Sequence, residues 1–289
     1  MIAQSIVSGL AIGGVYALLA VAFLLTYRVG GVLNFAQAQF VAVAAFVGST
    51  FSVRMGWPLI GAALVGIGVA AILGALMERV TYLPLHNKAH ASMIISTVAV
   101  GIIIEQGAHL IWGPDPRTLA SLVPNVPIEI AGNRLSLVSL FIFFISVILV
   151  IGLNLVLSRT RLGRQMEATS VDPDTAQLMG IRTGRIVIIA FVISTGLTGA
   201  AGILVAPMFA VTIHLGFLIA LKAFAASIIG GFGNLTGAAI AALMLGVVEN
   251  LAGTFIGSES KDLIAFALMI VFLIVRPQGI FGTKVGEKL

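Results

Sequence analysis

The chain has 289 residues, of which 59% are hydrophobic and only 9% are charged. A soluble domain carries roughly 25% charged residues, and a soluble fold of this length could not bury so much apolar surface, whereas membrane-spanning helices expose it to lipid. The composition therefore excludes a soluble enzyme and predicts an all-α polytopic membrane protein with about eight to ten transmembrane or re-entrant helices. Cysteine is absent, which excludes disulfides and thiolate catalysis. The net charge is +5. In a membrane protein such an excess of basic residues usually lies in cytoplasmic loops, so it does not indicate nucleic-acid binding.

Nine apolar runs follow one another along the chain. They span residues 5–27, 33–51, 58–77, 93–112, 136–157, 186–206, 216–231, 234–256 and 262–275. The second run begins with polar residues and the seventh is short and ends in glycines, so either could be a broken or re-entrant helix. Gly9 and Gly13 are spaced about one helical turn apart, which predicts close helix packing within the subunit, with a dimer seam as the alternative.

Basic residues indicate how the chain is oriented in the membrane. Five arginines lie between the fifth and sixth runs, namely Arg159, Arg161, Arg164, Arg182 and Arg185. The positive-inside rule places this region and the segment after the last run in the cytoplasm. The C-terminus is then cytoplasmic, the N-terminus outside, and the proline-rich residues 113–135 form an irregular external loop. Arg54 does not fit the rule, because it falls outside.

Residues 158–185 form the longest polar segment between the apolar runs. Within it, Asp172 is a good N-cap, Pro173 suits the first helical position and Gly180 suits the residue after the last turn. The pattern predicts a short helix over residues 173–179. Such a helix has little stability alone in water, so we expect it to rest on a partner. The alternative is an ordinary solvated basic loop.

Polar side chains at the start of the second run need hydrogen-bond partners at membrane depth. Asn34, Gln37 and Gln39 follow the Gly30-Gly31 pair. In a transporter such amides line the wet path or hold a broken helix, and the alternative is that they join helices together. Residues 230–238 repeat the two glycines, the Asn and the Ala at an offset of 200. This pattern indicates an internal repeat in which the Asn caps a helix, unless it arises by chance.

Three charged residues fall inside apolar runs. Glu105, Lys222 and Glu249 each lie about 10 Å from the outer end of their run, counted at 1.5 Å per residue. A charge at this depth is costly and usually pairs in the bundle interior. We expect Lys222 to bridge to Glu105 or Glu249, either as an external gate or as a static pair that fixes the packing.

Several stretches together resemble the LivH-type permeases, the membrane subunits of branched-chain amino acid ABC importers. The first lies in the polar segment and comprises Arg161, Gly163, Arg164, Ala168, Asp172, Ala176 and Gly180. The others are Asn34-Phe35-Ala36, Gly113-Pro114-Asp115-Pro116-Arg117, Lys222-Ala223-Phe224 with Gly230-Gly231-Phe232-Gly233, and the closing Arg276-Pro277-Gln278-Gly279-Ile280-Phe281-Gly282. The resemblance covers nearly the whole chain in order, as one transmembrane permease domain over residues 1–289 with a cytoplasmic coupling loop at about 158–185.

The resemblance implies a set of partners and a location. The chain would lie in the bacterial inner membrane and pair with a second LivH- or LivM-like permease subunit, or with a second copy of itself. Two cytoplasmic ATPase subunits would bind ATP and Mg, and this chain would hold no cofactor or metal. The seven residues of the polar segment named above would contact an ATPase, and a periplasmic or extracellular solute-binding protein would deliver the cargo.

The expected cargo is a branched-chain or other small amino acid, moved inward by alternating access. The translocation path or gate would include Asn34, Phe35, Gln37, Gln39, Glu105, Lys222 and Glu249. Family members often carry His, Gly and Glu after Asn-Phe-Ala, where this chain has Gln37, Ala38 and Gln39. This departure leaves urea, short amides and small carboxylates as alternative cargoes. A stand-alone secondary transporter is the alternative of another class.

Overall fold

The computed structural model describes the whole chain except residues 1, 87, 131–132, 277 and 283–289. Its helices are α1 (Ile2–Gly30), α2 (Gln37–Ser49), α3 (Leu59–Met77), α4 (Leu83–Leu85), α5 (His90–Trp112), α6 (Leu137–Arg159), α7 (Arg161–Val171), α8 (Pro173–Leu178), α9 (Thr183–Val205), α10 (Leu215–Gly230), α11 (Leu235–Phe255) and α12 (Ser260–Val275). Two π-helical turns, η1 (Thr50–Arg54) and η2 (Glu78–Tyr82), extend α2 and α3. Each of the nine predicted apolar runs corresponds to a helix, and six of the described helices are long and apolar enough to cross a membrane. The prediction of an all-α polytopic membrane protein is confirmed.

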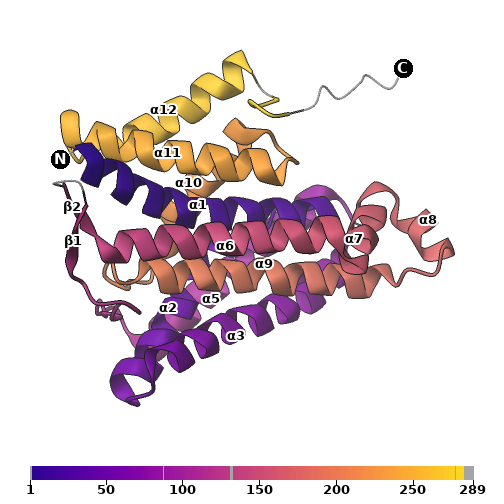
Figure 1. The fold of residues 1–289 in the computed structure, drawn as a ribbon. Coiled ribbons are helices and arrows are strands. Elements are labelled where there is room, and N and C mark those ends of the chain that lie inside the picture. The colour runs from indigo at the N-terminus through magenta and orange to yellow at the C-terminus, as the bar shows by residue number, and fades with distance from the viewer. Residues whose placement is uncertain (1, 87, 131–132, 277, 283–289) are drawn as a thin grey trace.

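Helix α1 forms the centre of the bundle and packs against α6, α9, α10 and α11 (Figure 1). Small residues allow its closest approach, to α11. A Cβ added to Gly9 would lie 2.7 Å from Val247 Cα, and one added to Gly13 would lie 2.8 Å from Leu243 Cα. Any larger side chain at either position would push the two backbones apart. The predicted role of these glycines in packing within the subunit is therefore confirmed.

Helix α2 begins inside the bundle. Its first residue, Gln37, donates hydrogen bonds to Ser194 and Thr198 near the middle of α9. The 13 residues of α2 rise only about 20 Å, so this helix covers part of the membrane thickness. The first turn of α10 contacts the first turn of α2, since a Cβ on Gly216 would overlap the Ala38 carbonyl group. The N-termini of two short helices therefore meet in the interior, as the broken-helix interpretation predicts.

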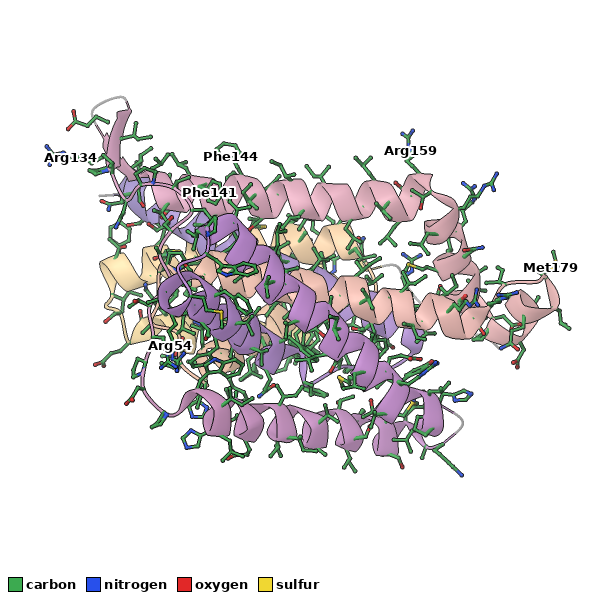
Figure 2. All side chains as sticks on the ribbon, turned by 90° about the horizontal axis from the view of Figure 1, so that it is seen from below. Arg54, Arg134, Phe141, Phe144, Arg159 and Met179 are labelled. Atoms are coloured by element: carbon green, nitrogen blue, oxygen red, sulfur yellow. The ribbon has the colours of Figure 1, made fainter. Side chains whose placement is uncertain are left out.

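The polar segments gather at the two ends of the bundle. The N-terminus lies at the same end as the β-strands, and α8 lies at the opposite end (Figure 1). Side chains follow the same division, with Arg54 and Arg134 at one end and Arg159 and Met179 at the other (Figure 2). The segment that follows α12 packs against the end of α10, because Phe281 N donates to the Gly230 carbonyl group.

The external loop is more ordered than its prolines suggest. It contains a two-stranded antiparallel hairpin of β1 (Pro127–Ile130) and β2 (Asn133–Ser136). Glu129 and Arg134 face each other across the hairpin with Nε and Oε1 2.9 Å apart. The expectation of a wholly irregular loop over residues 113–135 is therefore wrong for this part. Turn residues predict where a chain reverses, and the pairing of two four-residue strands is set by contacts that composition does not encode.

Candidate functional site

The predicted short helix exists as α8, one residue shorter than expected. The Asp172 carboxylate accepts hydrogen bonds from the backbone N–H groups of Asp174 and Thr175 at 3.0 and 3.1 Å, and also from the Thr175 hydroxyl. These bonds hold the pKa of Asp172 below its usual range, the Thr175 hydroxyl having the largest effect. Gly180 has a φ of +84°, so it ends the helix in a conformation that glycine adopts without strain.

A second helix, α7, precedes α8 and positions it. Thr160 caps α7 by accepting from Gly163 N at 3.2 Å. Gly163 is buried against the end of α6, where an added Cβ would overlap the Leu157 carbonyl group. Gly163 therefore sets the turn between α6 and α7 and presents no surface to a partner.

The surface of this segment differs from the predicted docking residues. Ala176 is only 4% exposed, so a charge placed there would disturb the packing of α8 before it could affect docking. In the described chain Ala176 therefore has almost no exposed surface for an ATPase subunit, and its direct contact stays a prediction. The exposed apolar side chains are Val171, Leu178 and Met179, at 81, 88 and 79%. The sequence contained a signal for them, because they are apolar residues in a strongly polar segment.

The remaining predicted coupling residues have different environments. Arg161 and Arg164 are exposed on α7, Ala168 is half-buried, and Asp172 is exposed but occupied in capping α8. In the described part of the chain neither arginine lies within 4.0 Å of a carboxylate oxygen, whereas Arg28 of α1 lies 3.7 Å from Glu167 of α7. The two arginines are therefore available to a partner.

The polar residues before α2 are buried in the bundle. Asn34 is fully buried, and its side-chain oxygen accepts from Ala36 N at 3.0 Å. Gln37 is also fully buried and donates to Ser194 Oγ at 2.9 Å and to Thr198 Oγ1 at 2.6 Å. The Asn34 Nδ2 and Gln37 Oε1 atoms have no hydrogen-bond partner among the described residues. Phe35 lies between them in sequence but is 38% exposed.

Asn34 and Asn234 act differently in the two copies of the suspected repeat. Helices α1 and α10 both end in a glycine, and the next residues, Gly31 and Gly231, have φ values of 69° and 108°. Asn234 caps α11 by accepting from Gly237 N at 2.9 Å, as predicted. Asn34 instead closes a tight turn before α2, and the expectation that it caps a helix is wrong.

A polar cluster lies where α2 and α10 begin. Gln39 in the first turn of α2 donates to Glu105 Oε2 of α5 at 3.1 Å. His214, directly before α10, places its Nδ1 3.3 Å from Glu105 Oε1. The Glu105 side chain is 23% exposed and that of His214 is 79% exposed, so the cluster opens to the outside of the subunit. We call Gln39, Glu105 and His214 the α2–α10 cluster.

Lys222 pairs with Glu249, as one of the two expected arrangements predicts. Their Nζ and Oε1 atoms are 2.6 Å apart and both side chains are almost fully buried. Asp262 of α12, a partner that the sequence did not predict, lies 2.6 Å from the same Nζ. Tyr16 of α1 donates its hydroxyl to Glu249 Oε2 at 3.0 Å. Four helices therefore meet at one lysine.

Glu105 is not a partner of Lys222, so the other expected arrangement is wrong. Depth along a helix can be counted from the sequence, but the position around the bundle is set by helix packing. That packing directs Glu105 toward α2 and Lys222 toward α11 and α12.

No group of three or more potential metal ligands occurs among the residues that the structure describes.

Comparison of the sequence with known proteins identifies the family of the chain. The family model described as branched-chain amino acid transport system / permease component matches residues 5–273. The chain belongs to this family. It is 30% identical to the high-affinity branched-chain amino acid transport system permease protein LivH of Escherichia coli K12, over 99% of this chain and 97% of the relative. It is 31% identical to the corresponding permease protein BraD of Pseudomonas aeruginosa over the same shares.

Membership in the permease family establishes the type of protein and its location. It is a permease subunit of an ABC importer, a transport component and not itself an enzyme, and a multi-pass protein of the inner membrane. A partial match of 32% identity to the permease protein LivM of Escherichia coli K12 covers 49% of this chain and 34% of the relative. This second similarity suggests pairing with a related permease subunit.

Proposed function

We propose that this permease moves branched-chain or other small amino acids into the cytoplasm by alternating access, driven by two ATPase subunits that bind ATP and Mg. A periplasmic or extracellular solute-binding protein delivers the cargo at the end of the bundle that carries the β-hairpin. The opposite end, with α7 and α8, faces the cytoplasm. The names of its relatives, which span nearly the whole chain, support the cargo class.

The observation that carries the coupling proposal is the exposed surface of α8. A six-residue helix is unstable alone in water, yet α8 is capped at both ends and places Leu178 and Met179 in the open. Burying an exposed leucine contributes about 1.5–3 kcal/mol. This gain stabilises the contact when an ATPase groove covers the helix. Closure of the ATPase pair then moves α8, and α7 transmits the movement to α6 and α9, which it contacts.

We place the translocation path beside the α2–α10 cluster. The N-termini of α2 and α10 meet there, and helix N-termini attract anionic groups such as the carboxylate of an amino acid. The Glu105 carboxylate is available to the ammonium group of the same cargo. An ionic cargo therefore fits this cluster better than uncharged urea or a short amide, although Gln39 stands where relatives often have an acid.

The second permease subunit, related to LivM or identical to this chain, is proposed to cover α5. Helix α5 packs mainly against α2, and only 17% of its most apolar stretch is buried. Its residues Ile102 and Ile103 are 55 and 68% exposed. A subunit seated here would enclose the α2–α10 cluster between two permeases. The Lys222–Glu249 pair lies on the other side of α10 and is proposed to hold α10, α11 and α12 together during the cycle.

Uptake by the reconstituted importer tests the proposal. The permease pair, the ATPases and the binding protein are incorporated into liposomes, and radiolabelled leucine, urea and acetamide are compared. We expect leucine uptake that requires ATP and is abolished when a hydrolysis-deficient ATPase is used as the control. Leucine uptake by this chain alone without ATP would instead support a secondary transporter. ATP-dependent uptake of urea in place of leucine would overturn the cargo.

A further inference from the structure

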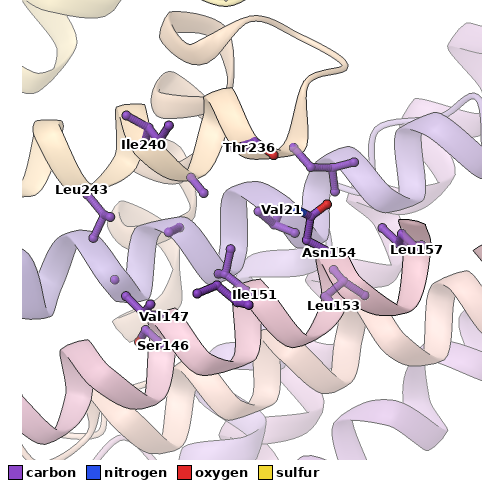
Figure 3. Close-up of a pocket in the computed structure, with 15 residues that line it drawn as sticks. Val21, Ser146, Val147, Ile151, Leu153, Asn154, Leu157, Thr236, Ile240 and Leu243 are labelled. Carbon is purple, nitrogen blue, oxygen red and sulfur yellow. The ribbon is translucent and has the colours of Figure 1, made fainter. Parts of the chain in front are cut away.

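A groove runs along α1 between α6 and α11 (Figure 3). Its floor consists of small side chains on α1, namely Gly14, Ala17 and Val21, and the two flanking helices form its walls. The cavity has a volume of about 190 Å³ and its lining is almost entirely apolar. It exists because α6 and α11 both pack on α1 but have few contacts with each other.

One end of the groove is polar. Asn154 of α6 and Thr236 of α11 lie there, and both also line a larger recess of about 600 Å³ that contains Arg28 and Asn234. Asn154 is exposed on a membrane-spanning helix, and its amide has no hydrogen bond within the described chain. An exposed amide near the end of a membrane-spanning helix is therefore available to a polar lipid group.

Arg28 gives this recess a positive charge. Its only ion pair among the described residues is the long contact to Glu167, 3.7 Å between Nη2 and Oε1, and its side chain is 42% exposed. Most donors of the guanidinium group are therefore free. A guanidinium group binds phosphate through paired hydrogen bonds.

The length of the groove indicates what fills it. Along α6 it extends from Ser146 to Leu157, which is about 16 Å at 1.5 Å per residue. The hydrocarbon core of a bilayer is about 30 Å thick, so one leaflet contributes about 15 Å. A helix of a partner subunit would cross both leaflets, whereas one acyl chain occupies a single leaflet. We propose that this groove and recess bind one anionic phospholipid, with an acyl chain between α6 and α11 and its phosphate at Arg28 and Asn154.

A second groove provides a matched control. It lies between α3, α6 and α9, has a volume of about 470 Å³, and is lined by apolar residues and one glycine, with no charged residue in its lining. Gly196 in this groove has only Ala71 Cβ near the position of an added Cβ, at 3.8 Å. Gly196→Leu therefore fills a groove that has no cation at its end. Lipid in this second groove should show no preference for the headgroup.

Native mass spectrometry tests the proposal on the assembled importer. The complex is released from nanodiscs that contain equal amounts of dioleoyl phosphatidylglycerol and dioleoyl phosphatidylcholine. We expect the wild type to retain phosphatidylglycerol selectively. Arg28→Gln should reduce this retention about fivefold, since one basic residue near an anionic lipid contributes about that factor. Thr236→Trp, which fills the polar end, should reduce it at least as much, and Gly196→Leu should leave it unchanged.

Three results would overturn the proposal. The first is equal retention of the two lipids by the wild type, and the second is unchanged retention in Arg28→Gln, whose exposed side chain can be replaced without disturbing the core. The third is that Thr236→Trp releases the second permease subunit while lipid retention stays at the wild-type level. This last result would identify the groove as a subunit interface. None of these results depends on which cargo is transported.

Discussion

Replacement of Lys222 by methionine should destabilise the permease strongly. Lys222 and Glu249 are 6 and 5% exposed, and the substitution leaves Glu249 with a single bond, from Tyr16. Removal of one partner from a buried ion pair costs about 3–5 kcal/mol, because an uncompensated charge remains in the interior. At about 2–4 °C per kcal/mol, the midpoint of thermal unfolding should fall by roughly 6–20 °C. Glu249→Gln should cost less, because Asp262 still faces the lysine.

The assay is thermal unfolding of the purified complex, followed by intrinsic fluorescence and by loss of the monodisperse species. Lys261→Met is the matched control, since among the described residues the Lys261 ammonium group contacts only the Asn250 side-chain oxygen, at 3.4 Å. We expect this control to shift the midpoint by less than about 3 °C, as is usual for a residue outside a buried network. A Lys222→Met protein with the same midpoint as the Lys261→Met control would show that the buried ion pair does not stabilise the bundle.

Three further predictions concern the packing, the path and the coupling segment. Gly202→Ala should cost about 1–3 kcal/mol in thermal unfolding, because the new Cβ would overlap the Val41 carbonyl group, as in an overpacked core. Gly152→Ala, with open space around it, should cause no loss of stability. Gln37→Leu should cost about 1–2 kcal/mol of stability, because the loss of its bonds to Ser194 and Thr198 is partly offset by removal of the unpartnered Oε1 atom. It should also lower uptake by liposomes, and normal uptake would remove this residue from the path. The protection factors of the α8 amides, which correct the exchange rate for its intrinsic pH dependence, should fall as pH falls through the lowered pKa of Asp172, because protonation ends its capping. Above the usual Asp pKa the cap should be complete, and Asp172→Ala should show low protection factors at every pH.

Features set by neighbouring residues in sequence could be predicted well. The bounds of α8 follow from Asp172, Pro173 and Gly180, since capping and helix termination involve only backbone groups a few residues away. The apolar runs likewise correspond to helices because hydropathy reports on each segment separately. Helix α2 could be recognised as unusual because polar residues and a Gly pair precede it.

Features set by three-dimensional packing could not be predicted. Counting residues from the outer end of each run placed Lys222, Glu105 and Glu249 at the same depth in the membrane. The count could not show which of the two acids pairs with the lysine, since each helix can rotate about its axis. Asp262 was missed because it lies near the start of its run, where a charge needs no special explanation. The burial of Ala176 depends on how α8 rests on α7 and α9, which the contacts of the folded chain decide.

We propose that α8 transmits the movement of the ATPase subunits to the permease, and the variant Leu178→Glu tests this role. Leu178 is 88% exposed, so the substitution should leave folding intact while placing a charge in the proposed ATPase groove, which is costly without a partner. Leu178→Met, which keeps a large apolar side chain at the same exposed position, is the matched control. The measurement is ATP hydrolysis stimulated by the loaded binding protein in liposomes. We expect a loss of at least about tenfold in Leu178→Glu, equivalent to about 1.4 kcal/mol, and no loss in the control; full stimulation in Leu178→Glu would contradict the account.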